Sequence, residues 1–350
     1  MNIKNKFLIL AVILVSSFAA AQKTLETLYG NFTITEPVLL DVLESSCLNR
    51  LRYIHQYGVD NYAIKEQDYF RYNHSVGVFV LLRAYGAPVH EQIAGLLHDA
   101  SHTIFSHVGD QVFDHPDAKN SYQDDIHEWY LKKTDIGDIL SQHAITIPEI
   151  LAKNKQFTAL EQDLPDICAD RLEYNLQGGL LEGLITHHEI AEILATLRFE
   201  NGCWYFTDTE QAKKFARISL YMTEHRWGSA DGLLIDWFAA QALKRALHLN
   251  LITLHDIHFS VDAVVWKKLC ESTDAIISEN IIKIMNGKNV YTLSNTRDFD
   301  LVLHGKFRGI DPLVQLKTGF VRLSEIDTEF NAEFVKLKNL MQHGWYIKFL

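Results

Sequence analysis

Histidine and aspartate residues of this sequence gather at spacings that suit metal binding. His98 and Asp99 are adjacent, and His74 precedes them in RYNHSVGV, at the start of a predicted helix. Asp170 lies in ADRLEY, on a distant predicted helix. Imidazole nitrogen and carboxylate oxygen are usual ligands of divalent transition metals in hydrolases. These four residues therefore form a candidate ligand set that leaves positions open for water and substrate.

One divalent ion is the predicted cofactor, and this donor set suits Fe, Mn, Zn, Ni or Co about equally well. Such an ion lowers the pKa of a bound water and neutralises charge on a phosphate oxygen. His102 lies one helical turn beyond His98, so we expect it near the metal without being a ligand. A single histidine on an apolar helix is more often structural, and it is the ordered set that favours a metal site.

The elements that must position these residues are mainly helical. Apolar residues recur at three- and four-residue spacing over 76–86, 91–98, 159–176, 180–198, 209–222 and 231–247. Asn201-Gly202 is typical of a β-hairpin turn, and short β-type runs begin at about residue 288. The sequence predicts a mainly α fold, with a helical body over 22–285 and a small α+β C-terminal portion over 286–350.

Composition limits the partners. The 350 residues include 33 Lys+Arg against 44 Asp+Glu, a formal net charge of −11. General nucleic-acid binding requires a basic surface, so the charge argues against it and leaves a small anionic ligand in a locally positive pocket. The four cysteines are Cys47, Cys168, Cys203 and Cys270. Three pairings are open if all four form disulfides, but mostly buried free thiols are the expectation.

The first 21 residues have the pattern of a secretory signal peptide. Lys4 and Lys6 precede an apolar run from Phe7 to Val15, and Ala19-Ala20-Ala21 supplies small residues before the expected cleavage. The run is short for a membrane span, so no transmembrane segment is expected after cleavage. Removal of the two lysines would change the net charge from −11 to −13. We expect a secreted or periplasmic protein, with an uncleaved N-terminal anchor as the alternative.

Several segments resemble one enzyme family in order and approximate spacing. They are LNRLRYIHQYG at 48–58, RYNHSVGV at 71–78, HDASHTIFSHVGD at 98–110 and HE at 127–128. In these the chain resembles the HD-domain metal-dependent phosphohydrolases, and most closely the dNTP triphosphohydrolase branch that includes the SAM-and-HD-domain enzyme. The resemblance spans about 40–180 and continues more weakly to about 320. It implies an all-helical HD-domain bundle, a phosphorylated substrate such as a nucleotide, and self-association into homo-oligomers.

The resemblance also implies roles for individual residues. It makes the metal ligands His74, His98, Asp99 and Asp170. It places a catalytic group beside the metal, consisting of His102, His107, Asp110 and His127. It assigns substrate contacts to Gln56, Arg71, Arg171 and Tyr174.

Spacing alone does not decide which histidine of that group is the general acid. His107 is our prediction, supported by an Asp110–His127 pair.

One stretch departs from the family pattern. The triphosphohydrolase branch usually continues after its last metal ligand as DxxxYxxRD, whereas here the Arg-Asp pair is replaced by Gln177-Gly178. The change removes a sugar-binding carboxylate. Trp227 lies where the family places an aromatic residue against the nucleotide, although such a residue is more often core.

The predicted function is therefore an exported phosphohydrolase that cleaves a nucleotide or other small phosphate ester with a metal-activated water. The alternatives are a metal-stabilised binding protein on the same fold without turnover, and a true dNTP triphosphohydrolase. Tripolyphosphate release from dNTPs would identify the last of these.

Overall fold

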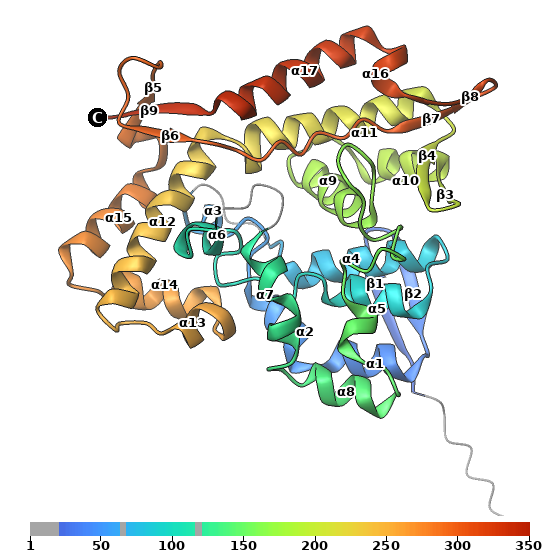
Figure 1. Ribbon diagram of the computed structural model, residues 1–350, viewed down its shortest axis with the longest axis horizontal. Coiled ribbons are helices and arrows are strands. Elements are labelled where there is room, and N and C mark those ends of the chain that lie inside the picture. Colours follow the sequence, from blue (N-terminus) through green and yellow to red (C-terminus); the bar gives the residue numbers. More distant parts are fainter. Residues whose placement is uncertain (1–20, 64–67, 116–120) are drawn as a thin grey trace, which may run out of the picture.

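The structure is a computed structural model that describes residues 21–63, 68–115 and 121–350 (Figure 1). The predicted signal peptide lies outside the described residues except for its last alanine. The helices of the first half are α1 (Pro37–Glu44), α2 (Ser46–Arg50), α3 (Asp60–Ala63), α4 (Arg71–Ala84), α5 (Val89–Leu97), α6 (Val108–Val112), α7 (Tyr122–Leu131), α8 (Ile136–Gln142), α9 (Ala169–Leu181) and α10 (His187–Thr196). The helices of the second half are α11 (Thr209–Met222), α12 (Ala230–His248), α13 (Leu254–Phe259), α14 (Asp262–Cys270), α15 (Ala275–Asn286), α16 (Leu323–Ile326) and α17 (Thr328–His343). The fold is mainly helical, as the sequence predicts.

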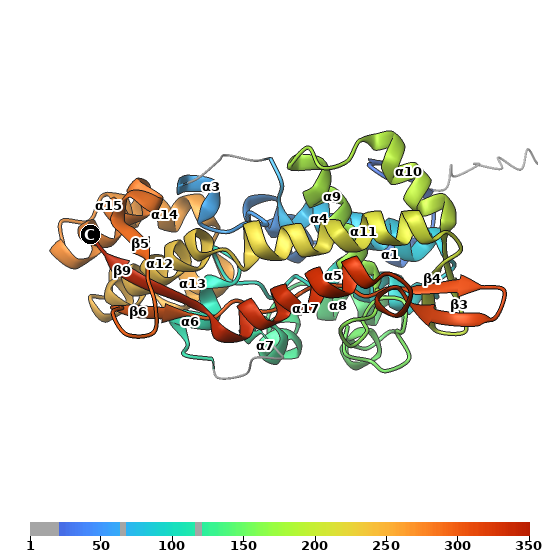
Figure 2. The same ribbon diagram turned by 90° about the horizontal axis from the view of Figure 1, so that it is seen from above.

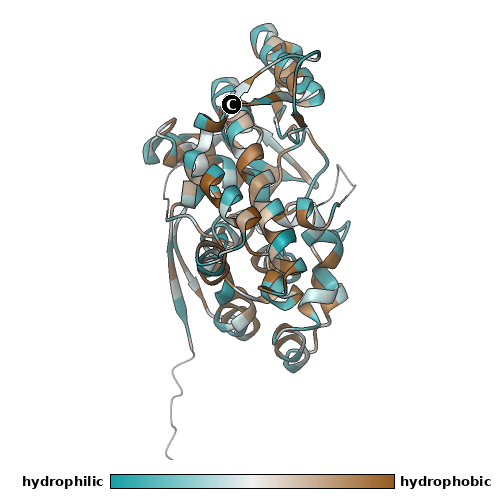
Figure 3. Cartoon of the chain, turned by 90° about the vertical axis from the view of Figure 1, so that its left-hand side faces the viewer, coloured by the Kyte–Doolittle hydropathy of each residue, from teal (hydrophilic) through white to brown (hydrophobic). Residues whose placement is uncertain are grey.

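Helix α4 is the centre of the packing. Its run of apolar residues buries both sides, because Phe79 and Val80 join one apolar core while Leu81 and Leu82 join the other. A helix that is apolar on all sides must be covered by neighbours, and α4 packs against α5 and α9. Figure 3 shows the complementary pattern on the other helices, which carry hydrophobic and hydrophilic residues on different sides. The helix that begins with the site residues is thus held on all sides.

Two predicted helices are shorter than expected. The helix predicted over 159–176 begins only at Ala169, and the one predicted over 180–198 is the shorter α10. Pro165 disfavours helical backbone in the residue before it, and the Glu91 carboxylate accepts bonds from the backbone N–H groups of Ala159 and Leu160. The apolar spacing at 159–168 therefore belongs to an irregular segment that is buried at its two ends.

Three small sheets accompany the helices. An N-terminal hairpin pairs β1 (Lys23–Thr27) with β2 (Gly30–Ile34), which the sequence did not lead us to expect. The predicted Asn201-Gly202 turn joins β3 (Leu197–Glu200) to β4 (Cys203–Phe206) with φ values of 51° and 78°, which confirms the hairpin. The C-terminal strands are β5 (Tyr291–Leu293), β6 (Leu301–Leu303), β7 (Leu313–Leu316), β8 (Gly319–Arg322) and β9 (Trp345–Phe349).

The C-terminal portion packs onto the helical body. Strand β7 pairs in parallel with β4, and β9 lies between β5 and β6. Helix α17 runs beside α11 in Figures 1 and 2 and contacts it. In the described part of the chain no helix is both long and apolar enough to cross a membrane. At the start of β9, Nε1 of Trp345 donates to the Gly228 carbonyl at 2.7 Å, which fastens the C-terminal portion to the segment before α12.

Candidate metal and phosphohydrolase site

His74 and His98 approach each other from two packed helices. His74 lies in the first turn of α4, and His98 follows the last residue of α5. Their Nε2 atoms are 3.1 Å apart, and both side chains are buried. Gly95 permits this close packing, because a Cβ there would lie 2.4 Å from Cδ1 of Leu82 on α4.

Asp99 and Asp170 complete the group. Oδ1 of Asp170 lies 2.9 Å from Nε2 of His74 and 3.5 Å from Nε2 of His98. Asp99 reaches the same nitrogens, with Oδ2 at 3.6 Å from His74 and Oδ1 at 3.5 Å from His98. The structure thus brings together all four predicted ligands, which we call the ligand cluster.

The protons of the two imidazoles are directed away from the cluster. Nδ1 of His98 donates to the Gly95 carbonyl at 2.8 Å, and Nδ1 of His74 donates to Oε2 of Glu173 at 2.5 Å. Neither acceptor can donate in return, so both Nε2 atoms are directed at the carboxylates of the cluster. Such outer partners typically fix the orientation of metal-binding histidines.

The cluster requires positive charge. Burial by itself lowers the pKa of His74, but the Glu173 and Asp170 carboxylates overcome it and raise that pKa to about 10. For Asp170, burial opposes ionisation, yet His74 and His98 hold its pKa well below the usual range. A divalent ion would supply this charge to two nitrogens and two carboxylates, so the residues fit the predicted metal.

His102 and His107 form a layer next to the cluster. Nε2 of His102 lies 3.2 Å from Oδ1 of Asp99, and burial together with the Arg71 charge lowers the pKa of His102 to about 3. The His107 ring meets the His102 ring edge to face at 4.9 Å. The His107 side chain is 38% exposed, against 3% for His102. His102 is therefore placed to support Asp99, and His107 is the one that solvent reaches.

The predicted Asp110–His127 pair is wrong. Oδ2 of Asp110 lies 3.6 Å from Nδ1 of His107, and Oδ1 accepts the backbone N–H of Tyr122 at 2.7 Å. His127 instead has its Nδ1 2.8 Å from Oγ of Ser101. Spacing did not reveal this, because it does not show that α7 presents its first residue, Tyr122, to Asp110 and directs His127 to Ser101. The support for His107 is Asp110 alone.

The four predicted substrate contacts lie at different distances from the cluster. Arg71 is buried and donates from Nη1 to Oδ2 of Asp99 at 2.5 Å and from Nε to Oγ of Ser106 at 2.8 Å. These are the side-chain hydrogen bonds that Arg71 makes with the described residues, and they use Nη1 and Nε. Nη2 is therefore available to a phosphate oxygen. Tyr174 is also buried, with its ring 6.3 Å from that of His74.

The other two predicted substrate contacts are Gln56 and Arg171. Oε1 of Gln56 is buried and has no hydrogen-bond partner among the described residues. Arg171 donates from Nη1 to the carbonyl of Asp166 at 3.0 Å, and nearby anionic groups raise its pKa although burial opposes this. The Trp227 ring packs edge to face against Tyr174 at 5.1 Å.

The departure at Gly178 has a structural explanation. A Cβ at Gly178 would lie 2.6 Å from Cε of Met222 and 3.1 Å from Oη of Tyr57. The space for an aspartate side chain is therefore occupied. Asp170, Tyr174 and Gly178 are spaced four residues apart, so they share one side of α9. The Tyr57 hydroxyl lies next to Gly178, at the position where the family has its sugar-binding carboxylate.

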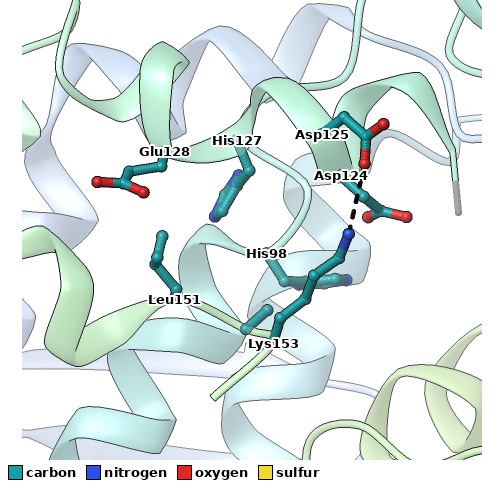
Figure 4. Close-up of a pocket in the computed structure, with 8 residues that line it drawn as sticks. His98, Asp124, Asp125, His127, Glu128, Leu151 and Lys153 are labelled. Carbon is teal, nitrogen blue, oxygen red and sulfur yellow. Dashed lines mark ion pairs between the residues drawn. The ribbon is translucent and has the colours of Figure 1, made fainter.

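A pocket of about 210 Å³ reaches His98 and His127 from the α7 side (Figure 4). Its wall is acidic, and its lining residues are His98, Asp124, Asp125, His127, Glu128, Leu151, Ala152 and Lys153. The single lysine lies 3.7 Å from an oxygen of Asp125. Burial lowers the pKa of His127 to about 4, and its Nε2 has no partner among the described residues.

Sequence reasoning missed several residues of the site. Glu173, which holds His74, lies three residues after Asp170 on α9, and this spacing is a signal that could have identified it. Glu161 and Cys168 offer further donor atoms within 4.8 Å of one another and of an oxygen of Asp170. Lys306 lies 3.5 Å from Oδ2 of Asp110 and comes from the C-terminal portion, which no local pattern could indicate.

All four cysteines are free thiols. Cys47 and Cys168 are buried, as expected, whereas Cys203 and Cys270 are exposed, which corrects the expectation of mostly buried thiols. Their places on β4 and at the end of α14 leave both on the surface.

The chain is similar in sequence to several known proteins. The chain is 30% identical over 336 residues to the uncharacterized protein YdhJ of Bacillus subtilis, covering 93% of this chain and 98% of YdhJ. It is 36% identical over 173 residues to the metal-dependent phosphohydrolase cns2 of Cordyceps militaris, covering 49% of each. It is 31% identical over 103 residues to the deoxynucleoside triphosphate triphosphohydrolase SAMHD1 of Xenopus laevis, covering 25% of this chain and 16% of that one. No protein-family model matches the chain.

The fold has solved counterparts. The crystal structure of a phosphohydrolase from Bacteroides thetaiotaomicron superposes with a TM-score of 0.66 at 14% identity, covering 94% of this chain and all of the other. With the relatives above, the chain belongs to the HD-domain metal-dependent phosphohydrolases. It is a hydrolase whose His and Asp residues form a candidate site for a divalent metal.

Proposed function

We propose that this protein hydrolyses a nucleotide or a related small phosphate ester, in a compartment outside the cytoplasm. The observation that carries the proposal is the convergence of the ligand cluster with Arg71, whose guanidinium bonds one ligand and keeps Nη2 available. The similarity of one segment to SAMHD1 supports a nucleotide as the substrate. The N-terminal sequence pattern supports export.

A divalent ion in the ligand cluster would supply Lewis acidity, activating water for attack on phosphorus and drawing charge from a phosphate oxygen. Arg71 would hold a phosphate oxygen next to Asp99, which orients phosphorus for attack by water. The bond from phosphorus to the leaving oxygen breaks as the water oxygen bonds to phosphorus, and the attacking water releases a proton to solvent.

A proton must then reach the leaving oxygen, and His107 is placed to donate it. Its ring is the exposed one of the layer, and Asp110 faces Nδ1, which directs Nε2 away from Asp110. His102 is unsuited to this step because its Nε2 faces Asp99.

The test is phosphate-release profiling of residues 22–350 with added Mn²⁺, Fe²⁺, Zn²⁺, Co²⁺ or Ni²⁺. The substrates are dNTPs, NTPs, nucleoside monophosphates, cyclic dinucleotides and simple phosphate esters. We expect turnover of at least one substrate, and loss of both metal content and turnover in the His98→Ala, Asp99→Ala double variant. Full activity in that double variant would contradict the proposal, as would one metal per chain without turnover of any substrate. Export is tested separately, by N-terminal sequencing of the protein recovered from its native host, where an intact Met1 would contradict it.

A further inference from the structure

Residues 159–168 form the irregular segment that leads into α9, and the two ends of this segment lie side by side. The backbone N–H of Ala169 donates to the Ala159 carbonyl at 2.8 Å, and the same carbonyl accepts a bond from Nε1 of Trp204 at 3.1 Å. The buried Glu91 carboxylate accepts the N–H of Ala159 at 2.8 Å. These bonds hold the beginning of the segment against the start of α9.

Three side chains with metal-binding atoms meet where the two ends join. A carboxylate oxygen of Glu161, Sγ of Cys168 and a carboxylate oxygen of Asp170 lie within 4.8 Å of one another. Cys168 is fully buried, and the other two residues are partly buried. We call these three residues the second donor set. Asp170 also belongs to the ligand cluster, and a carboxylate has two oxygens with which it can serve both groups.

Glu161 and Cys168 have no close partner in the part of the chain that the structure describes. Within residues 21–63, 68–115 and 121–350, no group lies at hydrogen-bond or ion-pair distance from the Glu161 carboxylate. The neighbouring Arg171 donates from Nη1 to the Asp166 carbonyl at 3.0 Å instead. Cys168 is a free thiol, and its Sγ donates no hydrogen bond to the same residues. Two carboxylates held close together in a partly buried place are costly unless a cation balances their charge.

The pocket beside His98 brings cations to this place. It reaches His98 (Figure 4), whose Nε2 lies 3.5 Å from Oδ1 of Asp170. Its lining carries three carboxylates against a single lysine, and that lysine faces Asp125 at 3.7 Å. A wall of this charge attracts cations and repels anions. The pocket therefore raises the local concentration of cations next to Asp170.

The donor atoms indicate which cation suits the second donor set. A thiolate sulfur favours ions such as Zn²⁺ and Co²⁺ over Mn²⁺ and Mg²⁺, which prefer oxygen. A tetrahedral zinc ion with ligands at about 2.0–2.3 Å needs donor atoms about 3.3–3.8 Å apart, so small rotations of the two carboxylates are sufficient. The thiol proton is released to solvent as the sulfur binds the ion. Three protein ligands leave one position for water.

We propose that Glu161, Cys168 and Asp170 bind a second divalent cation of the thiolate-binding class, such as Zn²⁺, beside the ion of the ligand cluster. The chain would then hold two ions that share Asp170 and differ in their other ligands, which are imidazole nitrogens in one case and a thiolate in the other. This inference goes beyond the proposed function, because the second ion binds whether or not a substrate is hydrolysed.

The test is a titration of the metal-free chain from residue 22 with Co²⁺, which substitutes for Zn²⁺ and can be followed by absorption. Cobalt bound by a thiolate absorbs in the near ultraviolet through sulfur-to-metal charge transfer, whereas cobalt bound by nitrogen and oxygen alone does not. The variants are Cys168→Ser and Glu161→Gln. The matched control is the Cys203→Ser, Cys270→Ser double variant, which removes the two exposed thiols. Elemental analysis gives the metal content, and thermal melting confirms that each variant is folded.

We expect two Co²⁺ but one Mn²⁺ per chain, with a charge-transfer band for cobalt. Cys168→Ser should abolish the band and leave one Co²⁺, and Glu161→Gln should weaken binding of the second Co²⁺ by about tenfold or more. The control should keep the band. A single Co²⁺ per unaltered chain, an undiminished band in Cys168→Ser, or loss of the band in the control would overturn the inference. If Cys168→Ser does not fold, Glu161→Gln decides, because Glu161 is partly exposed.

The two metal positions are separated by the His98→Ala, Asp99→Ala double variant. It should lose Mn²⁺ and keep the cobalt band, whereas loss of both would show that the second donor set does not bind an ion of its own. No step of this test measures turnover. Absence of hydrolysis would therefore contradict the proposed function and leave the second site unaffected.

Discussion

The Glu173 carboxylate accepts the Nδ1 proton of His74 at 2.5 Å, on the side of the ring opposite the ligand cluster. The same carboxylate accepts a bond from the Tyr69 hydroxyl at 2.7 Å, and both of these partners are buried. The Tyr29 hydroxyl donates to Oε1 of Glu173 at 3.3 Å, so two tyrosines hold the carboxylate that orients His74. The orientation of His74 is determined by a residue that does not itself reach the metal position.

We therefore predict that Glu173→Gln weakens metal binding by about tenfold or more while the fold is kept. The amide has nearly the same shape but lacks the charge that favours a proton on Nδ1. Metal affinity is measured by competition with a chromophoric chelator. Glu26→Gln, an exposed carboxylate on β1, is the control, and equal affinities of the two variants would contradict the role of Glu173.

A second prediction concerns the packing of Gly77 against the Glu173 carboxylate. A Cβ at Gly77 would lie 2.4 Å from Oε1 of Glu173, which its hydrogen bonds hold in place. Gly77→Ala should lower the free energy of unfolding by about 1–3 kcal/mol and weaken metal binding, although alanine favours helices. Gly137→Ala is the control in α8, where the nearest atom is 3.8 Å away, and it should leave stability unchanged or higher by up to about 1 kcal/mol. Denaturant unfolding checks both, and a stabilised Gly77→Ala would contradict the packing described.

The pH dependence of turnover tests the acid. Burial lowers the pKa of His107, and Asp110 opposes this by favouring the charged ring. A general acid must be protonated, so activity falls as the pH rises through the pKa of His107. Asp110→Asn removes the raising influence and should move the falling limb of kcat to lower pH by about one unit. Asp114→Asn, exposed and four residues later, should not move it, and an unmoved limb in Asp110→Asn would exclude His107 as the acid.

The thiols give a prediction independent of activity. A chromogenic disulfide reagent should label Cys203 and Cys270 in the native protein, because they are exposed, and all four cysteines after denaturation. Fewer than four labelled thiols in denaturant without reductant would reveal a disulfide.

The ligand cluster could be predicted because its residues carry a local signature. Adjacent His98 and Asp99 lie at the end of one helix, and His74 lies at the start of another. The pattern can therefore be recognised without knowing how the helices pack. The helix expected over 159–176 failed for the opposite reason. Ala159 and Leu160 are buried by partners distant in sequence, Glu91 among them, and burial of an irregular segment produces the same apolar spacing as a helix.

The residues that pair with His107 and His127 were harder to predict than these two histidines themselves. Asp110 lies three residues after His107, so their pairing follows from local geometry, whereas the position of His127 depends on how α7 is oriented. The hairpin β1–β2 has Leu28-Tyr29 at its turn, which lacks the Asn-Gly signal present between β3 and β4.

The contact between Lys306 and Asp110 has a consequence for how the enzyme comes into being. The residues of the ligand cluster end at Asp170 in α9, whereas Lys306 follows β6 in the C-terminal portion and is synthesised much later. A nascent chain would therefore carry the metal-binding residues before it carries the cation that pairs with Asp110. The charge around His107 would then be completed only after the four metal-ligand residues have emerged.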